Sequence, residues 1–182
     1  MKMTTVKKSV ITAICIALCV VLPIAFHAVP NAGSIFCPMH VPVLLCGLIC
    51  GCPLGLLCGL AGPLLSSLLT AMPPVAILPA MMVECAAYGA IAGLMMAWVH
   101  TRKVYADLYI SLVTAMLGGR ILAGIAKALI FARGSVSLAV WATSSFVTSL
   151  PGIALHLAII PSVVFALMKS NLIPLRYSEK TA

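Results

Sequence analysis

Glu84, Arg120 and Lys127 are charged side chains placed within long apolar stretches of the sequence, where their types and spacing could support chemistry. A charge at bilayer depth costs at least about 2.5 to 3.5 kcal/mol on insertion scales, so it normally faces a partner or a cavity. Arg120 and Lys127 are seven residues apart and lie close to one helical face, with Gly124 leaving open space between them. Tyr88 follows Glu84 by four residues and shares its face. We therefore expect these side chains to lie near one another.

This group of charges has two interpretations. In the first, Glu84 forms a fixed salt bridge with Lys127, at a similar shallow depth, or with the deeper Arg120, and the bridge orients the helices. In the second, one carboxylate and two cations line an outward-opening pocket, and the surplus positive charge favours an anionic or electron-rich ligand. His156 lies deep in the last apolar stretch, and we interpret it as a hydrogen-bonded core residue.

His40 precedes an apolar run that is rich in cysteine, SIFCPMHVPVLLCGLICG. Cysteine pairs at short spacing with further His or Cys residues are typical of zinc sites. Cys46, Cys50 and Cys52 nevertheless lie toward the far end of this predicted helix, roughly 10 residues or about 15 Å from His40 at 1.5 Å per residue, so they cannot share an ion with it. Cys37 is the cysteine that could. We predict no metal site and no cofactor, and we place His40 at the outer rim or mouth of a pocket.

The composition indicates an integral membrane protein. Hydrophobic residues make up 63% of the 182 residues and charged residues 8%, whereas a soluble domain is about half apolar and about a quarter charged. The basic residues lie mainly in short segments between apolar runs, so the net charge of +8 reflects membrane topology and not nucleic-acid binding. The cysteines lie almost entirely in apolar runs, and we expect most of them to be small core residues.

Turn signals divide the chain into six predicted membrane spans in one membrane domain, residues 1–182. The first apolar stretch is long enough to span and is expected to be a retained helix rather than a cleaved signal peptide. The second and third spans are short and rich in Gly and Pro, so a re-entrant pair is the alternative. The predicted spans are 9–28, 38–52, 54–71, 77–99, 105–131 and 142–168.

The distribution of basic residues predicts the orientation. Six spans place the lysines and arginines near the N-terminus, near residue 102 and after residue 168 on one side, which the positive-inside rule makes cytoplasmic. Both termini are then cytoplasmic, the location is the cell membrane, and the opposite side carries Arg133 alone.

Small residues spaced by four predict close helix contacts. Gly47, Gly51, Gly55 and Gly59 form one such series and Gly89 begins another with residue 93. In the first helix the same spacing occurs in AICIA, where Ala13 and Ala17 offer either an internal seam or a docking face for an external helix.

Several strings resemble the substrate-binding membrane subunits, or S components, of energy-coupling factor (ECF) vitamin transporters. They are SIFCPMHVPVLLCGLICG, GLAGPLLSSLLTAMPP, MMVECAAYGAIAGLM, AMLGGRILAGIAKAL and LPGIALHLAIIPSVV, and the likeness covers residues 9–168. The resemblance implies an all-α bundle of six helices that binds a micronutrient outside and topples in the membrane to release it. It also implies that Ala13 and Ala17 meet the transmembrane coupling subunit.

The same resemblance implies that energy and substrate contacts are divided between proteins. The chain has no G-x-x-x-x-G-K-[ST] phosphate loop, so a coupling subunit and two nucleotide-binding ATPase subunits would supply the power. Substrate contacts in the family come from the outer halves of the last three helices and from the loops at that end. The matching positions here are Asn31, Met39, His40, Met72, Glu84, Tyr88, Arg120, Lys127, Trp141 and Phe146.

The expected substrate is a planar nitrogenous heterocycle. Members that share Pro-Met-His-x-Pro are linked by analogy to queuosine precursors, pyridoxine-like vitamins and, less closely, pantothenate. Tyr88, Trp141 and Phe146 would stack on the ring, while Arg120 and Lys127 would face ring oxygens or a carboxylate.

Two other functional classes compete with this interpretation. One is a stand-alone secondary carrier in which Glu84 exchanges protons for substrate, although the sequence has no evident inverted repeat. The other is a membrane enzyme. One buried acid and serines that lack a catalytic pattern give little support for this class. We expect a binding subunit and not an enzyme.

Overall fold

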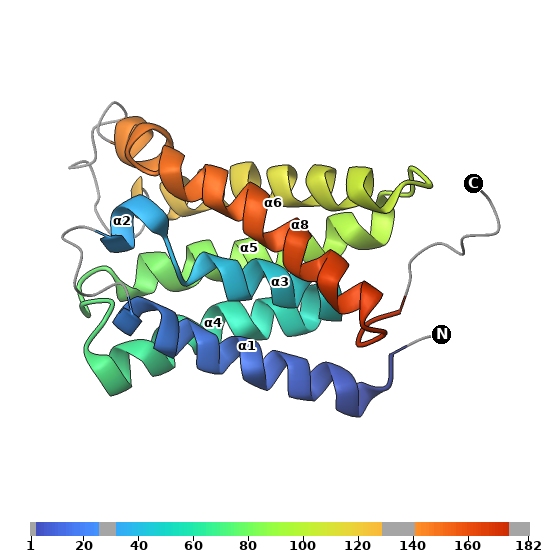
Figure 1. Ribbon diagram of the computed structural model, residues 1–182. Coiled ribbons are helices and arrows are strands. Elements are labelled where there is room, and N and C mark those ends of the chain that lie inside the picture. Colours follow the sequence, from blue (N-terminus) through green and yellow to red (C-terminus); the bar gives the residue numbers. More distant parts are fainter. Residues whose placement is uncertain (1–2, 26–31, 129–140, 175–182) are drawn as a thin grey trace.

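The computed structural model describes residues 3–25, 32–128 and 141–174, and these are helical without strands (Figure 1). Five of the helices are long and apolar enough to cross a membrane, which confirms the predicted all-α membrane protein. The elements are α1 (Thr5–Ala25), α2 (Ala32–Phe36), α3 (His40–Cys50), α4 (Cys52–Thr70), α5 (Leu78–Trp98), α6 (Val104–Ala126), the π-helix η2 (Thr143–Thr148) and α8 (Leu150–Lys169).

Two of the predicted spans need correction. The second, α3, has 11 residues and a length of about 16 Å, well short of a bilayer core of about 30 Å. The last is divided at Ser149 into the π-helix η2 and the α-helix α8, which has a proline at its N-terminus. Residues 26–28 and 129–131 of the predicted spans lie outside the described residues.

A hairpin of α3 and α4 explains why the short helix ends where it does. Gly51 adopts φ +95°, a left-handed value that glycine tolerates without steric cost, and a proline follows at the start of α4. The turn reverses the chain, so α4 runs back alongside α3 (Figure 1). Both helices pack against α5, which also contacts α6 and is the central helix of the described bundle.

Glycines let these three helices meet backbone to backbone, as their spacing predicts. A Cβ atom on Gly55 would lie 2.7 Å from the Cα atom of Gly47 and 2.8 Å from the carbonyl carbon of Gly89. A Cβ atom on Gly59 would lie 2.5 Å from the backbone nitrogen of Ala86. Each position therefore excludes a side chain because the neighbour is main chain, which cannot move aside. We call Gly47, Gly55 and Gly89 the glycine junction.

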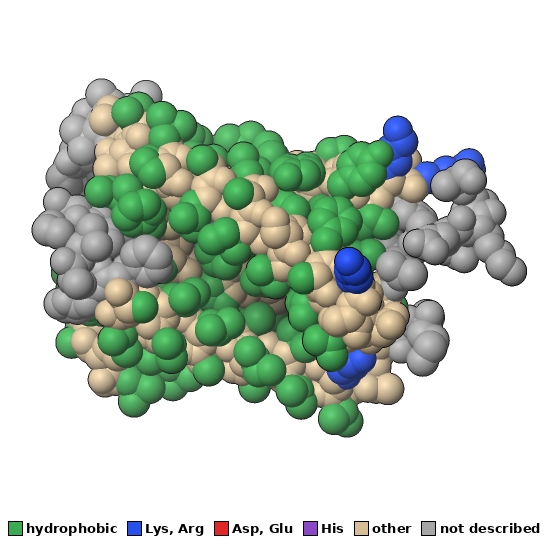
Figure 2. All heavy atoms as spheres, in the orientation of Figure 1, with side chains coloured by type: hydrophobic (Ala, Val, Ile, Leu, Met, Phe, Trp, Pro, Cys, Tyr) green, Lys and Arg blue, Asp and Glu red, His purple; other side chains and the backbone are tan. Residues whose placement is uncertain are grey.

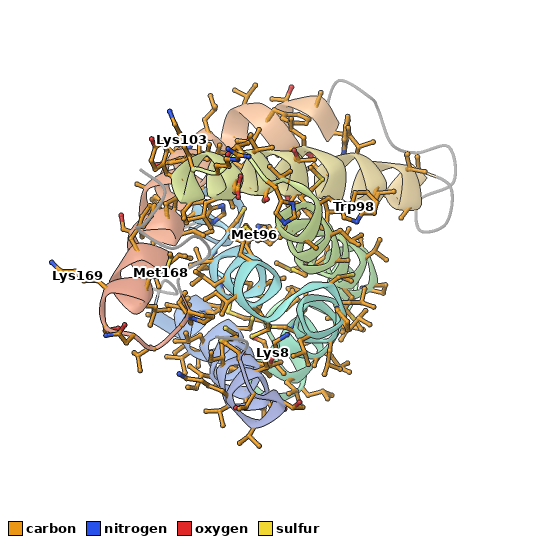
Figure 3. The ribbon with its side chains drawn as sticks, turned by 90° about the vertical axis from the view of Figure 1, so that its right-hand side faces the viewer. Lys8, Met96, Trp98, Lys103, Met168 and Lys169 are labelled. Carbon is orange, nitrogen blue, oxygen red and sulfur yellow. The ribbon has the colours of Figure 1, made fainter. Side chains whose placement is uncertain are left out.

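Apart from Arg120 and Lys127, the basic side chains of the described residues gather at one end of the bundle. Lys8 of α1, Lys103 before α6 and Lys169 of α8 lie at this end (Figure 3). In the face shown in Figure 2 the side of the bundle is covered largely by hydrophobic side chains and the lysines and arginines lie toward that same end. We call it the basic end. The loop between α4 and α5, together with α2 and η2, lies at the opposite end (Figure 1).

Asp107 is a buried acid at the basic end, whereas the sequence led us to expect Glu84 as the one acid within a span. It lies in the first turn of α6 and is fully buried. Its Oδ1 atom accepts hydrogen bonds from the backbone nitrogen and the hydroxyl of Thr101, at 2.8 and 2.7 Å. The carboxylate thus fixes the turn between α5 and α6, and a negative charge at a helix N-terminus is favourable.

The cysteines are core residues, as predicted. All eight are free thiols, and each is buried except Cys52, which is half-buried. The Cys46 thiol donates to the carbonyl oxygen of Leu54 at 3.4 Å, and the Cys19 thiol donates to that of Met39 at 3.8 Å. Cysteine therefore fills small spaces between helices here while its weak donor is satisfied.

Candidate functional site

A chain of hydrogen bonds crosses three elements at the end of the bundle opposite the basic end. The Tyr88 hydroxyl on α5 donates to Oε1 of Glu84 at 2.8 Å. Nε of Arg120 on α6 donates to the Tyr88 oxygen at 2.9 Å, and Nη1 of Arg120 donates to the carbonyl oxygen of Ser145 in η2. The Ser149 hydroxyl donates to that same carbonyl oxygen at 2.6 Å. We call Glu84, Tyr88 and Arg120 the polar relay.

The relay replaces the salt bridge that sequence analysis offered as one alternative. Among the described residues, neither Arg120 nor Lys127 forms an ion pair with Glu84, because the Tyr88 phenol lies between the carboxylate and the guanidinium. Arg120 is buried and Glu84 is partly exposed. Charge-assisted hydrogen bonds on both sides of one phenol tie α5 to α6.

Lys127 is not the second buried cation that was expected. Its side chain is exposed at the end of α6, although its backbone angles remain α-helical and its N–H donates to the carbonyl oxygen of Ala123. The relay therefore contains one carboxylate and one guanidinium, and the second cation is exposed instead of buried with them.

Two histidines lie against the relay. The ring of His40, at the start of α3, meets the ring of Tyr88 edge-on with centroids 4.8 Å apart. The ring of His156, on α8, lies 6.1 Å from that of His40. The exposed fractions of these histidines are 3% and 1%. The predicted position of His40 at an outer rim is therefore wrong, because the side chain is enclosed by α5 and α8.

The imidazole nitrogens of both histidines lack hydrogen-bond partners among the described residues. His156 is buried, as expected, and the backbone of residues 36–37 lies near its ring. It is also the site residue that sequence reasoning assigned to the core alone. Its nearness to His40 arises from the crossing of α8 over α3, which is visible in Figure 1 and has no signature in the sequence.

The aromatic side chains are arranged differently from the predicted stacking platform. Tyr88 packs its ring against Gly119 and against His40, so it contributes its hydroxyl rather than an open face. Trp141 and Phe146 form an edge-on pair with centroids 5.8 Å apart. The Arg120 guanidinium lies 5.7 Å from the centre of the Phe146 ring, within the range of a cation–π contact.

The other predicted positions lie around this cluster or away from it. Met39 is buried immediately before α3, and Met72 is half-buried in the loop after α4, where its carbonyl oxygen accepts from Ser66. Asn31 lies outside the described residues. Ala13 and Ala17 are exposed on α1, on the face opposite the buried Cys15.

The arrangement fits binding through hydrogen bonds. In the described part of the chain no group of three His, Cys, Asp or Glu side chains is placed to hold a metal ion. Ser145 and Ser149 were not predicted as site residues. They join the site through the backbone carbonyl oxygen of Ser145, which accepts from Arg120 and Ser149. A pattern of side-chain types in the sequence does not reveal a backbone contact.

Comparison with known families decides the class of protein. The sequence model of the family described as "ECF transporter, substrate-specific component" matches residues 7–169. The chain belongs to this family. Its members are transporter components that partner with the membrane and ATPase subunits of an ECF module, so the chain is a multi-pass membrane transport protein. The resemblance found in the sequence is confirmed. No curated protein and no solved structure matches the chain significantly.

Proposed function

We propose that this ECF substrate-specific component binds a small vitamin-like or nitrogenous heterocyclic micronutrient with high affinity at the polar relay and delivers it into the cell. Queuosine precursors and pyridoxine-like molecules are the leading candidates, ahead of pantothenate. The supporting observation is the relay itself, in which a partly exposed carboxylate, a buried phenol and a buried guanidinium lie beside two buried imidazoles. Polar groups at this depth normally serve a substrate pathway or a partner.

The proposed contacts divide into a centre and a periphery. His40, Glu84, Tyr88 and Arg120 form the centre. The peripheral positions are Asn31, Met39, Met72, Lys127, Trp141 and Phe146.

A transmembrane coupling subunit and two nucleotide-binding ATPase subunits supply the energy in this proposal. The first test is to purify the chain in detergent, release small molecules by denaturation and identify them by mass spectrometry. Copurification with the coupling subunit and uptake that requires ATP support the proposal. Uptake without the module that stops with a protonophore would instead support a proton-coupled carrier that uses Glu84.

We further propose six membrane passages, with α3 as the short one, and both termini in the cytoplasm of a cell-membrane protein. The gathering of Lys8, Lys103 and Lys169 at one end supports this orientation through the positive-inside rule.

The orientation predicts which exposed positions react from outside the cell. In a background lacking reactive thiols, Val75→Cys in the loop after α4 should react with a membrane-impermeant maleimide in intact cells, since this side chain is 78% exposed. Lys103→Cys at the basic end should react only after permeabilisation. The reverse pattern would place the basic end outside.

The exposed alanines predict a separation of binding from transport. Ala13→Leu and Ala17→Leu should abolish uptake and leave substrate affinity within about twofold, because bulk on the outer face of α1 blocks close approach of a partner helix. Val113→Leu on the exposed face of α6 is the matched control and should transport normally. Equal loss of binding in the alanine variants would place this seam inside the fold.

A further inference from the structure

His40 and His156 are the buried polar side chains whose ring nitrogens have no hydrogen-bond partner among the described residues. Such exceptions are uncommon, because a buried donor or acceptor without a partner loses its hydrogen bonds to water and gains none. Here two of them lie side by side, with ring centroids 6.1 Å apart and planes at 77°. Their shared position points to a common partner that is not part of the described protein.

The surrounding groups are already engaged and cannot serve as that partner. The Tyr88 ring touches His40, but the Tyr88 hydroxyl already donates to Glu84 and accepts from Arg120. The Ser145 carbonyl oxygen is used by Arg120 and Ser149. The backbone of residues 36–37 lies near His156, yet it makes no hydrogen bond of normal geometry with the ring nitrogens.

The charges around the histidines determine the charge of the missing partner. The relay contains one carboxylate and one guanidinium, while Lys127 is exposed. A net anionic ligand would therefore bring an uncompensated charge into the bundle, as would a cationic one. The Arg120 guanidinium also uses two of its donor groups for hydrogen bonds to Tyr88 and Ser145. It is therefore poorly placed to bind a carboxylate through two parallel hydrogen bonds.

The chemistry of imidazole determines the shape of the partner. A neutral histidine carries one donor nitrogen and one acceptor nitrogen, and a second positive charge beside Arg120 would be unfavourable at this depth. Two neighbouring neutral imidazoles thus present donors and acceptors within a few ångströms of each other. A ligand that satisfies them needs an N–H group and a carbonyl oxygen or ring nitrogen along one edge.

We propose that His40 and His156 recognise the hydrogen-bonding edge of an uncharged, planar nitrogen heterocycle. This inference rests on the proposed function and narrows it, since it excludes substrates whose recognised edge is a carboxylate.

The test compares ligands that differ by one carboxylate. The neutral probes are 7-cyano-7-deazaguanine, pyridoxine, nicotinamide and uracil, and their acidic counterparts are 7-carboxy-7-deazaguanine, 4-pyridoxate, nicotinate and orotate. Titration calorimetry is carried out on the full chain in lipid nanodiscs after removal of any bound molecule. We expect at least one neutral probe to bind with a Kd below about 1 µM and its acidic counterpart to bind at least about 100-fold more weakly.

Substitutions of His40 and His156 then test whether these two side chains recognise the bound probe. His40→Leu and His156→Leu should each weaken the best probe by about 10- to 100-fold, because a polar group of the ligand loses its partner in a buried site. His40→Gln and His156→Gln keep one donor and one acceptor and should recover most of the affinity. His100→Leu is the matched control, because this histidine is exposed near the basic end. Thermal unfolding of the ligand-free variants checks that each is folded.

Each outcome separates this inference from the proposed function. Preference for an acidic probe, failure of every neutral probe, or normal binding by both folded leucine variants would overturn the inference. If the chain still copurifies with an ECF module and releases a small molecule on denaturation, the proposed function stands. If it does neither, both fail.

Discussion

Gly89→Ala should prevent the chain from accumulating as a folded membrane protein. A Cβ atom at this position would overlap the main chain of Gly55, lying 3.0 Å from its Cα atom and closer still to its carbonyl group. Overpacking a core with extra methylene groups typically costs about 1 to 3 kcal/mol, mostly through side-chain adjustment. Here no side chain can move aside, so α4 and α5 must separate along their whole contact.

The measurement is the yield of monodisperse protein after detergent extraction, followed by its thermal unfolding temperature. Gly33→Ala is the control, because a Cβ atom there would have nothing within 4 Å. We expect wild-type yield for the control and almost complete loss for Gly89→Ala. An alanine variant with unchanged yield and unfolding temperature would mean that the helices tolerate a wider separation.

Arg120→Leu should destabilise the fold and abolish substrate binding together. A hydrogen bond that involves a charged group contributes about 1.5 to 3 kcal/mol, and Arg120 makes two of them. The leucine would leave the Tyr88 oxygen without its donor and would also release the Ser145 carbonyl oxygen in η2. Lys103→Leu removes an exposed cation at the basic end and should have little effect.

A double-mutant cycle distinguishes electrostatic coupling from lost packing. If the relay is coupled, Glu84→Gln combined with Arg120→Leu should destabilise the fold by less than the sum of the single changes, with a coupling energy of about 0.5 to 3 kcal/mol. Unfolding free energies in the same detergent supply the four corners of the cycle. Strict additivity would show that the carboxylate and guanidinium act independently despite the shared phenol.

The sequence predicted the features that depend on local chemistry. The predicted turn signals mark the ends of α4 and α5 to within about two residues, because turn residues interrupt a helix. The four-residue spacing of Gly55 and Gly59 in α4 predicted close packing, since a helix presents such residues on one face.

The features that were missed depend on helix crossing and on where a helix ends. Lys127 continues the backbone of α6, but it lies at the end of that helix, where its side chain is exposed. His40 is buried because α8 crosses the start of α3 and α2 packs on α8, an arrangement in which Gly152 lies against the carbonyl oxygen of Ile35. Neither crossing has a periodic signature, so the pairing of the two histidines could not be predicted from spacing.

The glycine junction also has a mechanical consequence. Where helices touch through side chains, rotamer changes can accommodate part of the displacement of one helix before the neighbouring helix moves. Where Gly47, Gly55 and Gly89 bring main chain against main chain, these residues have no side chain that could change its rotamer. We therefore expect α3, α4 and α5 to shift together, and Tyr88, one residue before Gly89, to move with them.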